Sequence, residues 1–152
     1  MRYDRRQKIL RMPTPPNPIV LYDGVCGLCN RLVQFILRHD QADVFRFASL
    51  QSPLAAELLE HHAVPADMNT VYVVLNHQQP AEQLPARSDA VIFILKKLPG
   101  HWAFWGGLCK LLPRRLRDAV YQLVASNRYR IWGKYDACPV PDAKHRHKFL
   151  DR

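Results

Sequence analysis

The sequence lacks the features that typify secreted disulfide-rich, membrane-spanning, repeat and nucleic-acid-binding proteins. Four cysteines in 152 residues are too few for a secreted disulfide framework. No continuous apolar stretch follows the charged N-terminus, so the sequence predicts no secretory signal. No apolar run approaches the ~20 residues needed to cross a bilayer. No internal repeat and no nucleic-acid-binding motif is present. We therefore expect a cytoplasmic chain without a transmembrane segment or a specific nucleic-acid partner.

Apolar residues, by contrast, are plentiful enough for a core. They make up 48% of the sequence, so we expect a domain that folds without disulfides. Residues 1–18 are basic and rich in proline and are expected to form a tail. A single domain is expected over residues 19–150, with a core at 19–98 and a helical extension at 99–150.

The net charge of +9 is carried by one end of the chain. Residues 1–95 hold nine Lys or Arg and nine Asp or Glu, whereas residues 96–152 hold thirteen and four. Such asymmetry can mean an acidic partner, a nucleic acid or an anionic membrane surface, whereas a basic surface can also serve solubility alone. Charge alone favours a plain solvated surface for the basic C-terminal third, with docking on an anionic partner as the alternative.

The most informative motif is a pair of cysteines three positions apart, Cys26 and Cys29. A short apolar run precedes the pair and a helical pattern follows it, which predicts Cys26 at a helix N-terminus. The free N–H groups and the dipole there favour negative charge, and the thiolate is the form that attacks disulfides. We expect Cys26 to attack a substrate disulfide and Cys29 to resolve the mixed disulfide, leaving the pair oxidised.

Asp23 precedes Cys26 by three residues and is the third candidate for the catalytic site. A carboxylate there can accept a proton from Cys29, while its charge opposes ionisation of Cys26. Asp-Gly is also common turn chemistry, and the two functions are compatible. The predicted site is therefore Cys26, Cys29 and Asp23, with no bound cofactor and no metal.

Two other interpretations of the cysteine pair stay open. The pair could hold zinc in an interaction module, which needs two further ligands. Alternatively, the chain is a binding domain that docks through its basic third, and the thiols are dispensable. The sequence favours a buried Cys109, a Cys138 in a flexible tail and solvated histidines at 61–62. The candidate further ligands for zinc are Cys109, Cys138, His61, His62, His145 and His147.

The apolar periodicity predicts alternating strands and helices. A strand–helix–strand opening implies a parallel pair with a right-handed crossover, and a later hairpin adds an antiparallel edge. This is the layout of an α/β, thioredoxin-like three-layer sandwich with a mixed central sheet and extra C-terminal helices. Strands are expected at 19–22, 44–48, 70–75 (central and buried) and 82–84, and helices at 30–38, from Ser52-Pro53, at 88–98 capped by Ser88-Asp89, and at 115–125.

The C-terminal helices are expected to cover part of the sheet or of the site. One face of the helix at 115–125 is apolar. The aromatic residues Trp102, Phe104 and Trp105 are expected to join the core, since that is the commoner place for such side chains.

The segment Asp23–Asn30 resembles the signature of the DCC family, named for its Asp-Cys-Cys motif. The resemblance covers roughly residues 19–150 and implies a thiol–disulfide oxidoreductase of thioredoxin-like fold that acts through Asp23, Cys26 and Cys29. It implies a thiol or disulfide substrate and a redox partner, and identifies neither. Further matching blocks are Phe45–Ser52, Arg87–Ala90, Leu116–Tyr121 and Asn127–Arg130. Within them Arg87, Ser88, Asp89, Arg128, Tyr129 and Arg130 match without an assigned role.

One departure from thioredoxins concerns the segment before the third strand. Thioredoxins carry a cis-proline there, facing the cysteine pair and contacting the substrate backbone. Here the stretch is Asp67–Thr70, and the nearest proline is Pro65. We expect that contact to be absent or supplied by Asn69 or Thr70.

Overall fold

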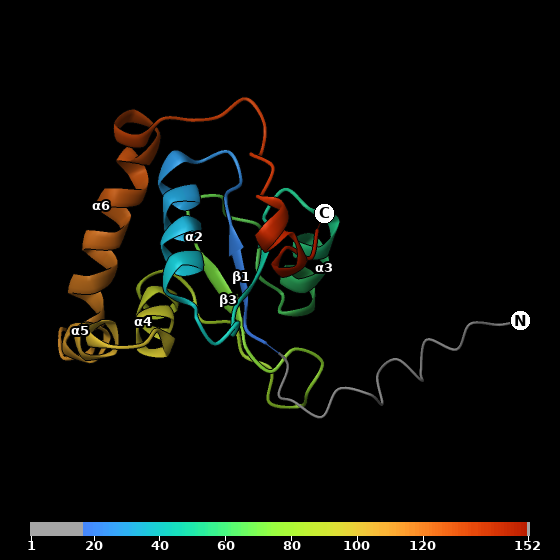
Figure 1. Cartoon of the computed structure of the whole chain (residues 1–152). Helices are drawn as coiled ribbons and strands as arrows, with labels where there is room; N and C mark the ends of the chain where they lie inside the picture. The colour runs from blue at the N-terminus through green and yellow to red at the C-terminus, as the bar shows by residue number, and fades with distance from the viewer. Residues whose placement is uncertain (1–16, 152) are drawn as a thin grey trace, which may run out of the picture.

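A computed structural model describes residues 17–151 (Figure 1). All but the last two residues of the expected N-terminal tail, 1–18, lie outside the described part. Strands and helices alternate through the first half of the chain, and helices fill most of the second half. The elements are β1 (Ile19–Tyr22), α2 (Gly27–His39), β2 (Arg46–Ser49), α3 (Pro53–His61), β3 (Tyr72–Val74), α4 (Ser88–Lys97), α5 (His101–Lys110), α6 (Arg114–Trp132) and the 3-10 helix η1 (Ala143–Lys148).

The three strands form one mixed sheet in the order β2-β1-β3. β1 pairs in parallel with β2, as the strand–helix–strand opening predicts, and antiparallel with β3. β1, and not the stretch at 70–75, is the central strand of this sheet. The chain does return antiparallel after β3, but the segment at 82–84 is not a regular strand: Gln83 makes an isolated bridge with Leu75, and Ala86 makes another with Tyr72. Because no neighbouring residue pairs extend either bridge, the segment does not form a strand.

The alternation of side chains along β1 creates two cores. Val20 and Tyr22 face the cluster formed with α2 and α4, whereas Ile19 and Leu21 face the cluster formed with α3. Figure 1 shows α2, α4, α5 and α6 on one side of the sheet and α3 on the other. This arrangement of three layers is a thioredoxin-like α/β fold and confirms the predicted class.

The helix caps were predicted with mixed success. Ser52 is the N-cap of α3, where its hydroxyl accepts the N–H of Ala55 at 3.2 Å. The cap predicted at Ser88-Asp89 is wrong, because Arg87 holds the N-cap position with a φ of 56° and makes no capping bond. The Ser88 hydroxyl instead donates to the carboxylate of Asp118 on α6.

The apolar face of α6 is not covered by the rest of the described chain. Leu116 and Leu123 are exposed, whereas Ala125 and Arg128 are the buried residues of this helix. On α5, Phe104 and Trp105 are also exposed, so their predicted burial is wrong. Of the three aromatic residues, only Trp102 packs against the core cluster. No helix in residues 17–151 is long and apolar enough to cross a membrane.

The chain ends by returning to the sheet. The ring of Phe149 stacks on Phe47 of β2 with centroids 5.3 Å apart, and Leu150 N–H donates to the Phe47 carbonyl at 2.9 Å. Lys148 forms a buried ion pair with Asp40 after α2, at 2.9 Å. These contacts tie the segment after α6 to the core and fix where that segment must cross the molecule.

Candidate active site

The turn from β1 into α2 places the two cysteines. Cys26 is the N-cap of α2, as predicted, and its Sγ accepts the backbone N–H of Cys29 at 3.3 Å. The turn is closed by the Cys26 N–H, which donates to the Asp23 carbonyl at 3.2 Å. A sulfur at this place replaces the usual Ser or Asp cap and meets the positive end of the helix dipole.

The two thiols differ sharply in acidity. A hydrogen bond from the Cys29 thiol lowers the pKa of Cys26 to about 6, against burial, which raises it. The same hydrogen bond, followed by burial, raises the pKa of Cys29. At neutral pH the arrangement therefore holds Cys26 as the thiolate and Cys29 as the thiol that donates to it.

Asp23 lies beside the pair as a fully buried carboxylate. One oxygen accepts from the Val25 N–H at 3.2 Å and from Gln51 Nε2 at 2.7 Å. The other accepts from Arg128 Nη2 at 3.2 Å and from the Tyr129 hydroxyl. Burial raises the pKa of Asp23, but these hydrogen bonds outweigh burial and hold it below the ordinary value. Asp23 is therefore ionised, and its charge contributes to the raised pKa of Cys29.

Arg128 is the cation that balances Asp23, and it is itself buried. Its guanidinium donates to the Asn69 side chain, to the Met68 carbonyl at 3.1 Å and to the Ala125 carbonyl at 2.8 Å. The guanidinium also lies 4.1 Å from the centre of the Tyr129 ring. Arg128 thus joins α6 to the cysteine turn and to the segment before β3.

Tyr129 completes this network as a donor. Burial and the hydrogen bond to Asp23 raise the pKa of Tyr129 to about 12, so the hydroxyl keeps its proton. Gln51 holds the turn from the other side, because its Oε1 accepts the Gly24 N–H at 3.1 Å while its Nε2 donates to Asp23. The sequence blocks that match the family contain Arg128, Tyr129 and Gln51. The sequence assigns these residues no function, since nothing in their spacing connects them to Asp23.

The residues after α6 cover Cys26. We call Gly133–Tyr135 the strap. Its first carbonyl accepts the Gly27 N–H at 3.0 Å, and its last N–H donates to the Val25 carbonyl at 2.7 Å. In Figure 1 the chain leaving α6 passes over the start of α2. Cys26 is fully buried, and it forms an isolated antiparallel bridge with Lys134 in the middle of the strap, so the strap lies directly against the cysteine turn.

A cavity of about 250 Å³ opens beside Cys29 rather than Cys26. Its wall is largely apolar and is built by α2, α4, α6 and the segment before β3. An aliphatic or aromatic group is the kind of ligand that such a wall favours. Besides Cys29, the lining residues are Leu28, Leu32, Met68, Asn69, Thr70, Val71, Val91, Tyr121, Val124, Ala125 and Arg128.

The segment before β3 differs from that of thioredoxins, as the sequence predicts. Residues 17–151 contain no cis peptide bond. The Tyr121 hydroxyl accepts the Val71 N–H at 2.9 Å and donates to the Asn69 carbonyl at 3.3 Å. The Thr70 N–H donates to the Asp67 carbonyl at 3.1 Å. The backbone groups expected to meet a substrate are therefore paired within the chain.

The remaining candidate residues lie elsewhere or act structurally. Cys109 on α5 is only half-buried, against the expectation of burial. Cys138 packs against Gly24, and its Sγ lies 3.6 Å from the Ser49 hydroxyl. No third His, Cys, Asp or Glu joins Cys26 and Cys29 in a metal-sized cluster within residues 17–151.

The block Arg87–Ala90 ties two helices together. Besides the Ser88 bond to α6, the carboxylate of Asp89 pairs with Arg117 and with Arg114, each at 3.1 Å. These contacts hold α6 against α4. They contribute to the site indirectly, because α6 carries the buried cation.

Comparison with known proteins gives a consistent result. A sequence model of the DCC1-like thiol-disulfide oxidoreductase family matches residues 20–134. The uncharacterized protein YuxK of Bacillus subtilis (strain 168) is 36% identical over 135 residues, 89% of this chain and 95% of that protein. The DCC family protein At1g52590, chloroplastic, of Arabidopsis thaliana is 35% identical over 124 residues, 81% of this chain and 69% of that protein. No solved structure matches the chain. The family resemblance carried by Asp23–Asn30 is confirmed.

Proposed function

This chain belongs to the DCC1-like thiol-disulfide oxidoreductase family, and on that premise we propose that it exchanges a Cys26–Cys29 dithiol and disulfide with a thiol or disulfide substrate. One observation carries the proposal: the Cys26 sulfur caps α2 and accepts the Cys29 N–H at 3.3 Å. A thiolate held there, with a protonated thiol one turn later, is the arrangement that exchange requires.

The proposed reaction has two steps. The Cys26 thiolate attacks one sulfur of a substrate disulfide, so that a new S–S bond forms, the substrate bond breaks and one substrate thiolate leaves. Cys29 then loses its proton and attacks the Cys26 sulfur, which releases the second substrate thiolate and leaves the Cys26–Cys29 disulfide. The substrate gains two electrons and the pair loses two. A dithiol redox partner returns them by the same steps in reverse.

Asp23 is the proposed acceptor of the Cys29 proton. It is ionised, and its charge contributes to the raised pKa of Cys29. Both of its oxygens already accept hydrogen bonds. To take the proton, Asp23 must release one of these bonds.

Exchange at Cys26 also requires the strap, Gly133–Tyr135, to move. Two backbone hydrogen bonds connect it to the cysteine turn. The alternative route runs through the apolar cavity to Cys29, whose pKa is raised and whose sulfur is the weaker nucleophile at neutral pH. We therefore propose that a substrate displaces the strap. The cavity is then free to hold an apolar group of that substrate.

Variants of the two cysteines test the exchange. With a small aromatic disulfide as substrate, Cys26→Ser is expected to abolish turnover, and Cys29→Ser is expected to accumulate a mixed disulfide on Cys26 that mass spectrometry detects. Cys109→Ser is the matched control, because this half-buried thiol lies on α5 outside the site. Full activity of both site variants would exclude the proposed reaction. We place the reaction in a reducing cytoplasm, where such a pair is more often reactive than structural.

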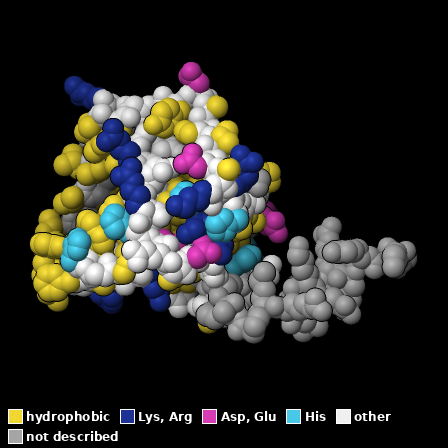
Figure 2. Space-filling model, in the orientation of Figure 1, with side chains coloured by type: hydrophobic (Ala, Val, Ile, Leu, Met, Phe, Trp, Pro, Cys, Tyr) yellow, Lys and Arg dark blue, Asp and Glu magenta, His cyan; other side chains and the backbone are white. Residues whose placement is uncertain are grey.

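The surface of α5 and α6 that residues 17–151 leave uncovered supports a second proposed activity, docking on an anionic membrane surface. Phe104 and Leu111 are 67% and 80% exposed. Figure 2 shows hydrophobic side chains gathered over α5 and α6, with Lys and Arg beside them. Exposed apolar residues flanked by basic ones are typical of surfaces that lie in the membrane interface. The basic residues of this region include Lys96, Lys97, Lys110, Arg114 and Arg115.

Vesicle binding tests this docking. The chain is expected to sediment with vesicles rich in anionic lipid and not with neutral vesicles, and added salt is expected to weaken the binding. Leu111→Glu is expected to reduce binding, whereas the control Val140→Glu, at a residue 75% exposed outside α5 and α6, is not. Failure to bind anionic vesicles, or equal effects of the two variants, would exclude this surface.

A further inference from the structure

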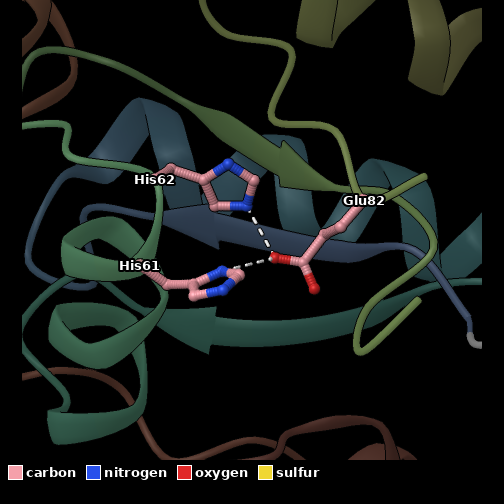
Figure 3. Close-up of side chains that lie close together, drawn as sticks. All are labelled: His61, His62 and Glu82. Carbon is pink, nitrogen blue, oxygen red and sulfur yellow. Dashed lines mark hydrogen bonds and ion pairs between the residues drawn. The ribbon is translucent and has the colours of Figure 1, made fainter. Parts of the chain in front are cut away.

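Three histidines and one carboxylate meet at the end of α3, away from the residues used above. His61 ends α3 and His62 is its C-cap, whereas His77 and Glu82 belong to the loop after β3. Figure 3 shows the rings of His61 and His62 facing one oxygen of Glu82. The sequence offers His61 and His62 as candidate zinc ligands but does not connect them to Glu82, which lies 20 residues beyond His62.

The donor atoms converge at short distances. His62 Nε2 lies 2.6 Å and His61 Nδ1 3.3 Å from Glu82 Oε1. The ligand atoms of His61, His62 and Glu82 all lie within 4.8 Å of one another. Around a tetrahedral zinc ion with bonds of about 2.0–2.1 Å, neighbouring donors are roughly 3.3 Å apart. The His61–Glu82 distance already meets this spacing, and the His62–Glu82 distance reaches it with a shift of less than about 1 Å.

The second oxygen of Glu82 is held separately. Oε2 accepts the Gln78 N–H at 2.7 Å and lies 3.1 Å from His77 Nδ1. A ligating carboxylate in a metal site commonly has its outer oxygen fixed by such partners, which orient the inner oxygen toward the ion. The Glu82 side chain is only 7% exposed, so its geometry is fixed by the fold and not by solvent.

The cluster also has the exposure of an open metal site. His61 is 73% exposed and His62 17% exposed, so one ligand faces solvent while the other two are held by the fold. An ion bound by three protein groups there would keep a fourth position for water. Two imidazoles and one carboxylate suit zinc or a similar divalent transition metal, and they are a poor set for magnesium or calcium, which prefer oxygen ligands only.

We propose that His61, His62 and Glu82 bind one divalent transition-metal ion of the zinc class, with His77 and the Gln78 N–H orienting the carboxylate. The ion joins the end of α3 to the loop after β3. Because it binds the folded arrangement in preference to the unfolded chain, it raises the melting temperature as the free metal concentration rises above the dissociation constant. The site is independent of Cys26 and Cys29.

Binding of zinc chloride to the reduced full chain tests the proposal. Equilibrium dialysis with metal analysis is expected to give one zinc per chain, unchanged in the variant with both Cys26→Ser and Cys29→Ser. His61→Ala is expected to weaken binding well beyond tenfold, since loss of an orienting partner alone weakens metal sites by about 10–100-fold. His77→Ala, at such an orienting residue, is expected to fall within that range. His101→Ala, at an exposed histidine on α5, is the matched control and is expected to bind as the unaltered chain does.

Substitution with cobalt gives a readout of the ligands. Four-coordinate cobalt absorbs visible light, and the expected spectrum lacks the intense charge-transfer band of a thiolate ligand. The proposal is overturned by no zinc uptake, by uptake that survives both His61→Ala and Glu82→Gln, or by uptake that disappears with the two cysteine substitutions. Circular dichroism of His61→Ala checks its folding, which is expected to be unchanged because this side chain is 73% exposed.

Discussion

Replacing Arg128 by methionine tests the network that fixes the cysteine turn. The guanidinium and the Asp23 carboxylate form an ion pair at 3.2 Å, with side chains 5% and 0% exposed. Methionine keeps an unbranched apolar stem but removes the charge. Asp23 then stays ionised in a buried position with the hydrogen bonds of Tyr129, Gln51 and the Val25 N–H but without its cation.

The expected loss of stability follows from that burial. Removing one partner of a buried ion pair costs about 3–5 kcal/mol, because the other charge is left without compensation. Three remaining hydrogen bonds to Asp23 favour the lower end of this range, about 3 kcal/mol. A domain of this size has about 5–15 kcal/mol of stability, so the variant is expected to fold.

Urea denaturation of the reduced protein at neutral pH measures the loss, and a double-mutant cycle assigns it. In an Asp23→Asn background, Arg128→Met is expected to cost at least about 1 kcal/mol less, within the 0.5–3 kcal/mol by which contacting residues are coupled. Arg130→Met is the control on the same helix, since this exposed arginine is expected to change stability by no more than about 0.5 kcal/mol. A loss at Arg128 equal to that of the control would refute the reasoning.

Three further predictions concern the same turn. Cys29→Ala is expected to raise the pKa of Cys26 above 6, because it removes the hydrogen bond that is the largest cause of the lowering, whereas Cys29→Ser keeps a donor. Identical pH profiles of Cys26 alkylation in the two variants would contradict this. Tyr135→Pro removes the N–H donated to Val25 at 2.7 Å and is expected to speed alkylation of Cys26; an unchanged rate would show that the strap does not limit access. Burial raises the pKa of Asp23, but its hydrogen bonds outweigh burial and hold the pKa below the ordinary value. The ionised carboxylate therefore contributes its full stabilisation above about pH 4, and this stabilisation is lost as pH falls through the lowered pKa. The stability difference from Asp23→Asn is therefore expected to shrink only below about pH 4, and a decline beginning near neutral pH would disprove it.

Local signals in the sequence account for the part of the fold around β1. The apolar run at 19–22 and the cysteine pair after it predict a strand that turns into a helix with Cys26 at its start, and the structure has this arrangement. Ser52 and Pro53 predict the start of α3 in the same way. These features depend on neighbours within one turn, which a sequence displays directly.

α6 shows why such signals fail at longer range. Its apolar pattern predicts that Leu116 and Leu123 face the core, yet both are exposed. The face that packs inward carries Arg128 instead, because a buried Asp23 needs a cation. A hydrophobic pattern does not identify the inward-facing side of a helix when that side is determined by an ion pair. The resemblance to the family blocks was the only sequence signal that pointed to Arg128.

Contacts between segments far apart in the chain were equally impossible to predict from the sequence. His62 and Glu82 meet only because the end of α3 and the loop after β3 lie side by side in the folded chain. The Ser88 hydroxyl was expected to cap a helix, but Asp118 on α6 offers it a stronger, charged acceptor. Both outcomes depend on the packing of helices that sequence spacing does not specify.

The absorbance of the Cys26 thiolate against pH tests the central claim most directly, because it reports on a buried sulfur without needing a reagent to reach it. The difference between the unaltered chain and Cys26→Ser is expected to titrate with a pKa of about 6. A pKa at or above about 8.5, the value of a free thiol, would contradict an activated nucleophile at the N-terminus of α2 and with it the proposed exchange.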